Sequence, residues 1–179
     1  MTKKFVRVLG LDDGAFSRSK DLWAPLVGVV YRLDGLIEKI YRRKIKVDGT
    51  DVSDSIIGII REYGGKIAMT VSEGVTFGGF NIPDIKYIFE KTGVPYISYL
   101  RRKPSISSIE DAMRKYGLND NIKLLQKLDL KECHIEGMTI YLNVYGLNEG
   151  EALKLLLRTI HTGRKSEPVR IADMIGRLI

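Results

Sequence analysis

The sequence predicts an α/β protein with a mixed β-sheet and helices on both faces. Two observations predict this class. Three strand-like apolar segments begin the chain, and Asp34-Gly35, a dipeptide typical of hairpin turns, joins the second to the third. Amphipathic segments with helical spacing then alternate with short apolar runs, as in parallel β-α units. With 179 residues and a hydrophobic fraction of 44%, the chain can form one complete core, so we predict a single domain over residues 1–179.

Apolar periodicity and turn signals place each expected element. The expected strands cover residues 5–11, 26–33, 36–47, 66–71, 95–100, 132–136 and 139–145. The expected helices cover residues 53–63, 81–93, 106–116, 119–128, 148–160 and 168–179. Ser53, Asn81 and Asn148 have the side chains of helix N-caps, and Gly64 and Gly93 are suited to end the helices before them.

The order of these elements also indicates a topology. A strand, a hairpin, a helix and a further strand follow one another in ribonuclease H-like folds, so the order favours that fold by analogy. If strand 66–71 lies parallel to strand 5–11, both strands end at the same edge of the sheet. Open α/β sheets place their ligands at this edge.

Two adjacent carboxylates, Asp12 and Asp13, follow the first strand and precede Gly14. Because successive side chains of a strand point to opposite faces, only one of the two acids can point into any one site. Asp-Asp-Gly is also good turn chemistry, which is the alternative explanation. We expect Asp12 to face the site and Asp13 to point away from it.

Further acids follow the next elements. Glu73 comes after strand 66–71, and Asp48, Asp51 and Asp54 lie between the third strand and the first helix. Turn formation, a helix N-terminus or a solvated loop explains each of them singly. Converging carboxylates repel one another unless a cation lies between them, and Mg²⁺ and Mn²⁺ prefer oxygen ligands. We therefore predict a Mg²⁺ or Mn²⁺ site formed by Asp12, Glu73 and one acid of the group Asp48, Asp51 and Asp54.

A glycine-rich loop, residues 74–81, enters the N-terminus of an expected helix. Free backbone N–H groups at such a position suit a phosphate. Gly78, Gly79 and Asn81 are the predicted contacts to nucleic acid in this loop. A tight turn with positive φ at a glycine is the alternative explanation.

Two basic segments lie elsewhere in the chain. Arg101, Arg102 and Lys103 follow strand 95–100 at the edge of the sheet, where cations bind phosphates and offset transition-state charge. We predict all three to contact nucleic acid. The run Lys39–Lys46 is also basic, and protection of an edge strand by charge is its alternative explanation.

Composition restricts the class of protein further. The formal net charge of +7 favours a polyanionic partner, although solubility alone also explains it. The single cysteine, Cys133, excludes an intrachain disulfide, and no apolar run reaches the length of a membrane span. We therefore expect a cytoplasmic protein without a membrane or disulfide partner, and with nucleic acid as its partner.

Several segments together resemble the archaeal domain-of-unknown-function family numbered ninety-nine, and the resemblance spans nearly the full chain. The segments are Arg7–Gly14, Leu26–Val30, Val47–Asp51, Gly74–Asn81, Gly93–Ile97 and Glu167–Ala172. The sequence Phe-Gly-Gly-Phe-Asn within Gly74–Asn81 is the most specific of them. The resemblance implies an endonuclease V-like, ribonuclease H-like fold.

Endonuclease V uses Mg²⁺ to cleave nucleic acid near deaminated bases, and the resemblance implies roles for four residues here. Asp12 matches the metal-binding aspartate of its first strand, and Glu73 stands where that enzyme has an aspartate. Arg101 takes the place of a functional lysine. Asp51, or else Asp54, takes the place of a glutamate at the helix entry.

The chain also departs from endonuclease V in its Glu73, in the absence of a Pro-Tyr-Ile-Pro wedge, and in the absence of a His-Pro-Arg loop. These departures favour a substrate other than an inosine-containing strand. The predicted function is a divalent-metal-dependent nuclease or phosphodiesterase that uses a metal-activated water, with Asp12, Asp51, Glu73 and Arg101 as catalytic residues. The alternative is a non-catalytic module that binds nucleic acid or a nucleotide through a degenerate site.

Overall fold

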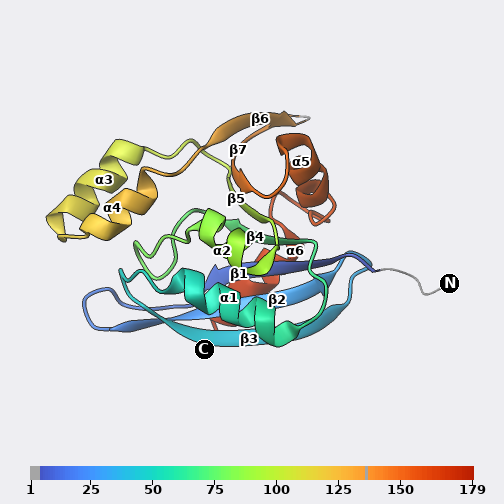
Figure 1. Cartoon of the computed structure of the whole chain (residues 1–179), viewed down its shortest axis with the longest axis horizontal. Helices are drawn as coiled ribbons and strands as arrows, with labels where there is room; N and C mark the ends of the chain where they lie inside the picture. Colours follow the sequence, from blue (N-terminus) through green and yellow to red (C-terminus); the bar gives the residue numbers. More distant parts are fainter. Residues whose placement is uncertain (1–4, 136) are drawn as a thin grey trace.

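The computed structural model describes residues 5–135 and 137–179, and a sheet of seven strands forms its centre (Figure 1). The strands are β1 (Arg7–Asp13), β2 (Trp23–Arg32), β3 (Ile37–Lys46), β4 (Met69–Glu73), β5 (Tyr96–Leu100), β6 (Lys131–Ile135) and β7 (Met138–Tyr145). Their order is β3-β2-β1-β4-β5-β7-β6. β1 is antiparallel to β2 and parallel to β4, and β4 is parallel to β5. The predicted mixed sheet is confirmed.

Helices cover both faces of this sheet, as predicted. They are α1 (Val52–Tyr63), α2 (Ile85–Thr92), α3 (Ile106–Lys115), α4 (Asn119–Leu125), α5 (Glu149–Leu157) and α6 (Glu167–Gly176). α1 and α2 lie in front of the sheet in Figure 1 and α6 lies behind it, while α3 and α4 pair at one end. Among the described residues, no helix has the length and apolarity needed to cross a membrane.

Side chains alternate along β1, so its two faces pack against different helices. Leu11 belongs to the buried cluster that includes residues of α1 and α2. Gly10 lies on the other face, so close to α6 that an added Cβ would collide with the backbone of Pro168. Because alternate residues share a face, Asp13 lies on the α1 face and Asp12 lies on the α6 face.

Several element boundaries differ from the predicted ones. β2 begins at Trp23 rather than Leu26, and β4 runs to Glu73 rather than ending at Val71. Glu136, the last residue of the predicted strand 132–136, lies outside the described residues. Strand pairing extends β2 and β4 beyond their apolar runs, and the sequence pattern alone does not reveal this pairing.

Two of the three predicted helix caps are wrong. The N-cap residues of α1 and α2 are Asp51 and Asp84. Ser53 lies inside α1, and its hydroxyl accepts a hydrogen bond from the backbone N–H of Asp84 at 2.9 Å. Asn81 is fully buried before α2 begins. The third cap, Asn148, forms the expected capping box with Glu151.

Candidate functional site

Three carboxylates converge on one cation at the C-terminal ends of β1 and β4. The parallel register pairs Leu11 with Ser72, so Asp12 and Glu73 are the next residues at the same edge. Lys165 Nζ lies 3.4 Å from Asp12 Oδ2 and 3.7 Å from Glu73 Oε2. The same atom lies 3.1 Å from Asp173 Oδ2 on α6. The structure therefore brings Asp12 and Glu73 together, as expected, and adds Lys165 and Asp173.

Contacts on both sides hold the segment that carries Lys165. The backbone N–H of Ser166 donates to the Tyr99 hydroxyl on β5 at 2.9 Å. The Thr159 hydroxyl, just after α5, donates to the Ser166 hydroxyl at 2.8 Å. The Lys165 side chain is 23% exposed, so solvent screens its charge only in part. Its position is set by β5, the end of α5 and the start of α6.

Lys165 and Asp173 were missed by sequence reasoning, although one signal for Asp173 exists. Val169 and Ala172 lie on the buried side of α6, and Asp173 is one helical turn after Val169. An acid beside the buried stripe of an amphipathic helix is unusual and points to a partner. Lys165 lies in a loop without periodicity, and its sequence context carries no such signal.

The ionisation of the site reflects burial and the surrounding charges. Burial raises the pKa of Asp12 to about 6; Lys165 opposes this shift, while Asp13 and Asp173 add to it. Burial lowers the pKa of Lys165, but its hydrogen bond to Asp173 and the neighbouring carboxylates outweigh burial, so the net shift is upward. The hydrogen bond from Arg177 lowers the pKa of Asp173. This environment favours a cation among the acids.

The glycine-rich loop is bonded to carboxylates of the chain itself. Asp13 points away from Asp12, as expected, and its Oδ2 accepts a hydrogen bond from Gly78 N at 2.6 Å. Asp48 Oδ1 accepts one from Phe80 N at 2.8 Å. An added Cβ on Gly79 would collide with Asp48. The loop thus binds acids of the chain in place of a phosphate, and the structure gives no support to Gly78 and Gly79 as phosphate contacts.

Asp51 has a structural role at the turn between β3 and α1. Its Oδ1 accepts hydrogen bonds from Asn81 Nδ2 at 2.7 Å and from Lys46 N at 3.1 Å. Because Asn81 is fully buried, it cannot make the predicted contact with nucleic acid. Asp54, the alternative to Asp51, accepts a hydrogen bond from the Tyr87 hydroxyl at 3.3 Å. The structure joins neither acid to Asp12 and Glu73.

The donor type at the convergent acids suits Mg²⁺ or Mn²⁺, because carboxylate oxygens are the ligands these ions prefer. Within residues 5–135 and 137–179, however, no group of three or more His, Cys, Asp or Glu side chains has the spacing of a metal site. The ammonium of Lys165 lies between the three acids, at 3.1 to 3.7 Å from each. The site therefore stabilises a cation as it stands, and a metal ion would have to replace Lys165.

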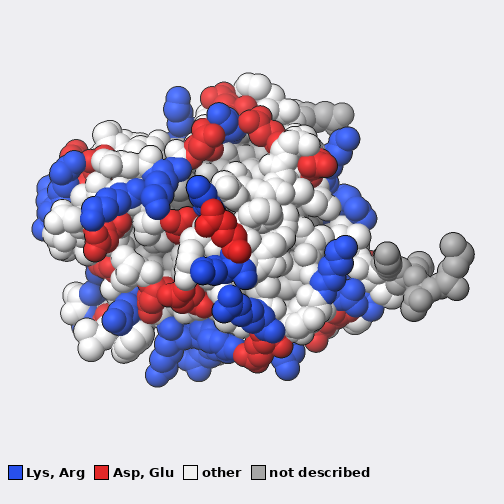
Figure 2. Space-filling view, in the orientation of Figure 1, with Lys and Arg blue, Asp and Glu red and all other residues white. Residues whose placement is uncertain are grey.

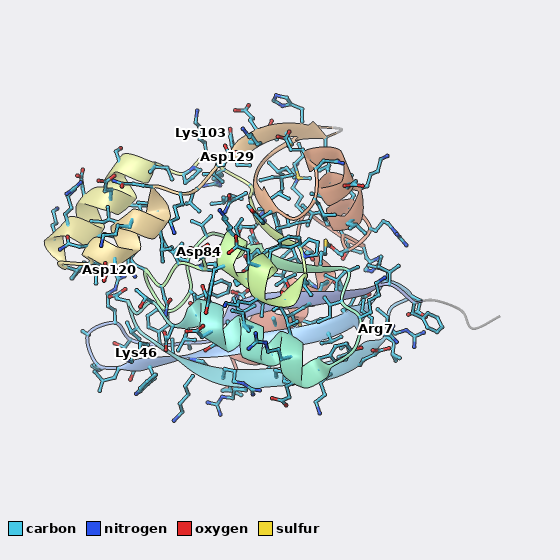
Figure 3. The ribbon with its side chains drawn as sticks, in the orientation of Figure 1. Arg7, Lys46, Asp84, Lys103, Asp120 and Asp129 are labelled. Atoms are coloured by element: carbon cyan, nitrogen blue, oxygen red, sulfur yellow. The ribbon has the colours of Figure 1, made fainter. Side chains whose placement is uncertain are left out.

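A cavity of about 460 Å³ lies beside Glu73. Arg101, Arg102 and Arg164 are among its lining residues. Arg101 also forms an ion pair with Glu73 through its Nε. Lys103, labelled in Figure 3, is exposed and does not line this cavity. Three arginines that line a cavity beside Glu73 offer forked N–H donors of the kind that bind phosphate.

A family model described as Endonuclease dU matches residues 4–179. The chain belongs to the Endonuclease dU family. A relative in Thermoplasma volcanium, a UPF0215 protein, is 34% identical over 178 residues, which cover 99% of this chain and 91% of the relative. A UPF0215 protein of Thermococcus kodakarensis is 34% identical over 183 residues, which cover 99% of this chain and 93% of that protein.

Solved structures extend the comparison of this Endonuclease dU family member. A protein of unknown function from Archaeoglobus fulgidus is 31% identical, with a TM-score of 0.79 and 96% of each chain covered. Endonuclease V of Ciona intestinalis, in complex with inosine-containing DNA, is 12% identical, with a TM-score of 0.64 over 98% of this chain and 86% of that one. At this identity the likeness shows the fold alone, and it confirms the predicted endonuclease V-like, ribonuclease H-like fold.

Proposed function

We propose that this protein is a divalent-metal-dependent nuclease that hydrolyses phosphodiester bonds in nucleic acid. The observation that carries the proposal is the convergence of Asp12, Glu73 and Asp173 on one cation, next to the arginine-lined cavity. Membership of the Endonuclease dU family and the fold shared with endonuclease V support it.

Asp12, Glu73 and Asp173 would hold the ion, with the Lys165 ammonium moved aside. Mg²⁺ or Mn²⁺ bound there would supply charge neutralisation at the phosphate and activation of the attacking water. The strand holds the Asp12 side chain, and the backbone N–H of Asp13 donates a hydrogen bond to its Oδ1 at 3.0 Å, which supports this role. A short strand and a packed helix hold the acids, which favours a constant geometry.

The basic residues would hold the strand and offset charge. Arg101 pairs with Glu73 and lines the cavity, and this supports a role in which its guanidinium would stabilise the charge that develops on the phosphate. Arg102 and Arg164 line the same cavity and would hold a backbone phosphate. Lys103 would contact the strand outside the cavity. The family's description favours deoxyuridine-containing DNA as the substrate.

One observation favours the alternative, a binding module without catalysis. Lys165 lies among the acids, where a hydrolytic enzyme of this type needs its metal ion. If Lys165 never leaves, the acids serve only to hold it and the arginines still bind phosphates. The experiment below separates the two functions.

Cleavage of labelled strands tests the proposal. Single and double strands with uracil, inosine or only unmodified bases are incubated with Mg²⁺ or Mn²⁺ and the wild type, Asp12→Asn or Asp13→Asn. We expect cleavage, fastest with uracil, by the wild type and by Asp13→Asn, which changes the adjacent acid on the opposite face. Asp12→Asn should be about 100-fold slower or worse, because even residues that only support metal ligands contribute 10- to 100-fold.

Equal background cleavage by the wild type and Asp12→Asn would reject the nuclease. If both proteins nevertheless bind the strands with strongly salt-dependent affinity, the binding module is the correct function.

A further inference from the structure

The start of β2 and the end of β3 place three cations beside an exposed tryptophan. The antiparallel register pairs Trp23 with Lys46 and Pro25 with Lys44, and Arg42 comes two residues before Lys44. Paired residues share a face of the sheet, and so do alternate residues of one strand. Trp23, Arg42, Lys44 and Lys46 therefore lie on one face, and we call these four residues the β2–β3 platform.

The platform lies on the same face of the sheet as Asp12. Asp12 pairs with Val27 of β2, and Val27 pairs with Arg42 of β3. Since neighbouring strands are about 4.8 Å apart, the backbones of Asp12 and Arg42 are separated by about 10 Å, the length of about three stacked nucleotides. α6 covers Val27, but it ends at Gly176 beside the loop that follows β1. Beyond that end Trp23 is 47% exposed.

No ion pair is found for Arg42, Lys44 or Lys46 in the described part of the chain, and all three are exposed. Their neighbour Arg43, which points to the other face, is by contrast paired with Glu62. Figure 3 places Lys46 at the end of β3. Figure 2 shows the opposite face, covered by α1 and α2, and Lys and Arg side chains lie along its lower border, where Figure 1 places β3. Unpaired cations at this density attract a polyanion.

The tryptophan indicates the kind of polyanion. Lys46 Nζ lies 6.0 Å from the centre of the Trp23 ring, so a charge and an aromatic surface are presented together. Bases stack on exposed aromatic rings only when they are unpaired, while cations track the phosphates between them. Protection of the β3 edge against aggregation would need the charges but not the exposed ring.

We propose that the β2–β3 platform binds an unpaired segment of the nucleic acid strand whose phosphodiester lies at Asp12 and Glu73. This inference rests on the proposed function and specifies its substrate as a strand with single-stranded sequence beside the cleaved bond. The Trp23 ring stacks with a base, and Arg42, Lys44 and Lys46 contact phosphates.

Binding of a fluorescein-labelled oligodeoxythymidine in EDTA, followed by anisotropy over a salt series, tests the inference without cleavage. The platform variants are Lys44→Ser/Lys46→Ser and Trp23→Ala. The matched control is Lys66→Ser/Lys115→Ser, which removes the same charge from two exposed lysines, one between α1 and β4 and one at the end of α3. Thermal melting verifies that each variant folds. If Trp23→Ala does not fold, the double lysine variant, which changes only exposed side chains, still tests the inference.

We expect the double lysine variant to reduce the slope of log affinity against log salt by about 1.4, because each lost phosphate contact reduces it by about 0.7 for single strands. Trp23→Ala should weaken binding about 5- to 150-fold at fixed salt. The control should keep the wild-type slope, apart from a small effect of net charge.

The inference would be overturned if the double lysine variant kept the wild-type affinity and salt slope and self-associated in light scattering. The lysines would then protect the edge of the sheet. An equal loss of affinity for polyglutamate and oligodeoxythymidine, with no effect of Trp23→Ala, would also overturn the inference, in favour of an acidic protein partner. If the platform variants bind normally while the wild type cleaves strands, this inference fails and the proposed function stands. If no strand is cleaved but the platform variants lose binding, the platform binds single strands and the proposed nuclease function fails.

Discussion

Asp12→Asn is expected to stabilise the protein at pH 8 by up to about 3 kcal/mol. Folding raises the pKa of Asp12 from 3.8 to about 6, chiefly through burial. Each unit of difference corresponds to about 1.4 kcal/mol. The folded state therefore binds the Asp12 proton more tightly than the unfolded state, and the resulting stability is complete below pH 4 and is lost as the pH rises to about 6. An asparagine has no charge to bury, so it avoids this loss.

Thermal melting between pH 4 and pH 8 measures this effect without added metal. For a chain of this length about 2–4 °C correspond to 1 kcal/mol, so Asp12→Asn should melt about 6–12 °C higher than the wild type at pH 8 and nearly together with it at pH 4. Asp129→Asn, at an acid whose side chain is 74% exposed, is the control and should leave the melting temperature nearly unchanged. A lower melting temperature for Asp12→Asn at pH 8 would mean that the pair with Lys165 outweighs the burial of Asp12.

Lys165→Met is expected to strengthen the binding of Mn²⁺ at least about 10-fold. The ammonium lies within 3.7 Å of all three acids, and a charge pair at about 4 Å contributes up to about 4 kcal/mol at an effective dielectric constant of 20. A metal ion must displace this interaction in the wild type but not in the variant. Methionine is unbranched and fills much of the space of the lysine stem without its charge.

Calorimetric titration of Mn²⁺ compares Lys165→Met with the wild type and with Lys115→Met, a control at an exposed lysine of α3. The gain should be largest at low salt, where the lost charge is least screened. Unchanged or weaker binding of Mn²⁺ by Lys165→Met would show that the lysine does not compete for the position of the ion.

Local patterns predicted the sheet and two of the three acids that meet at Lys165. The Asp34-Gly35 turn and the later β-α alternation indicated the mixed sheet, and alternation along β1 separated Asp12 from Asp13. Glu73 followed from the parallel placement of β4. Each of these inferences uses residues within one strand or between two strands, where the period of the side chains is fixed by the backbone.

The positions of Lys165 and Asp173 depend on contacts between distant segments. Lys165 and Asp12 are separated by 153 positions, and they meet because α6 packs on Gly10 through Pro168. No local period encodes such a crossing. The surroundings of Asp51 also depend on a distant segment, since the buried amide of Asn81, 30 positions later, hydrogen-bonds to its carboxylate. The metal-binding role of Asp51 stays a prediction.

Anomalous scattering from crystals soaked in Mn²⁺ tests most directly whether Asp12, Glu73 and Asp173 form a divalent cation site. We predict a peak about 2.1 Å from a carboxylate oxygen of each acid, with Lys165 Nζ displaced from its place between them. The absence of a peak, with Lys165 Nζ still 3.1 to 3.7 Å from the three acids, would contradict the metal site and with it the proposed hydrolysis.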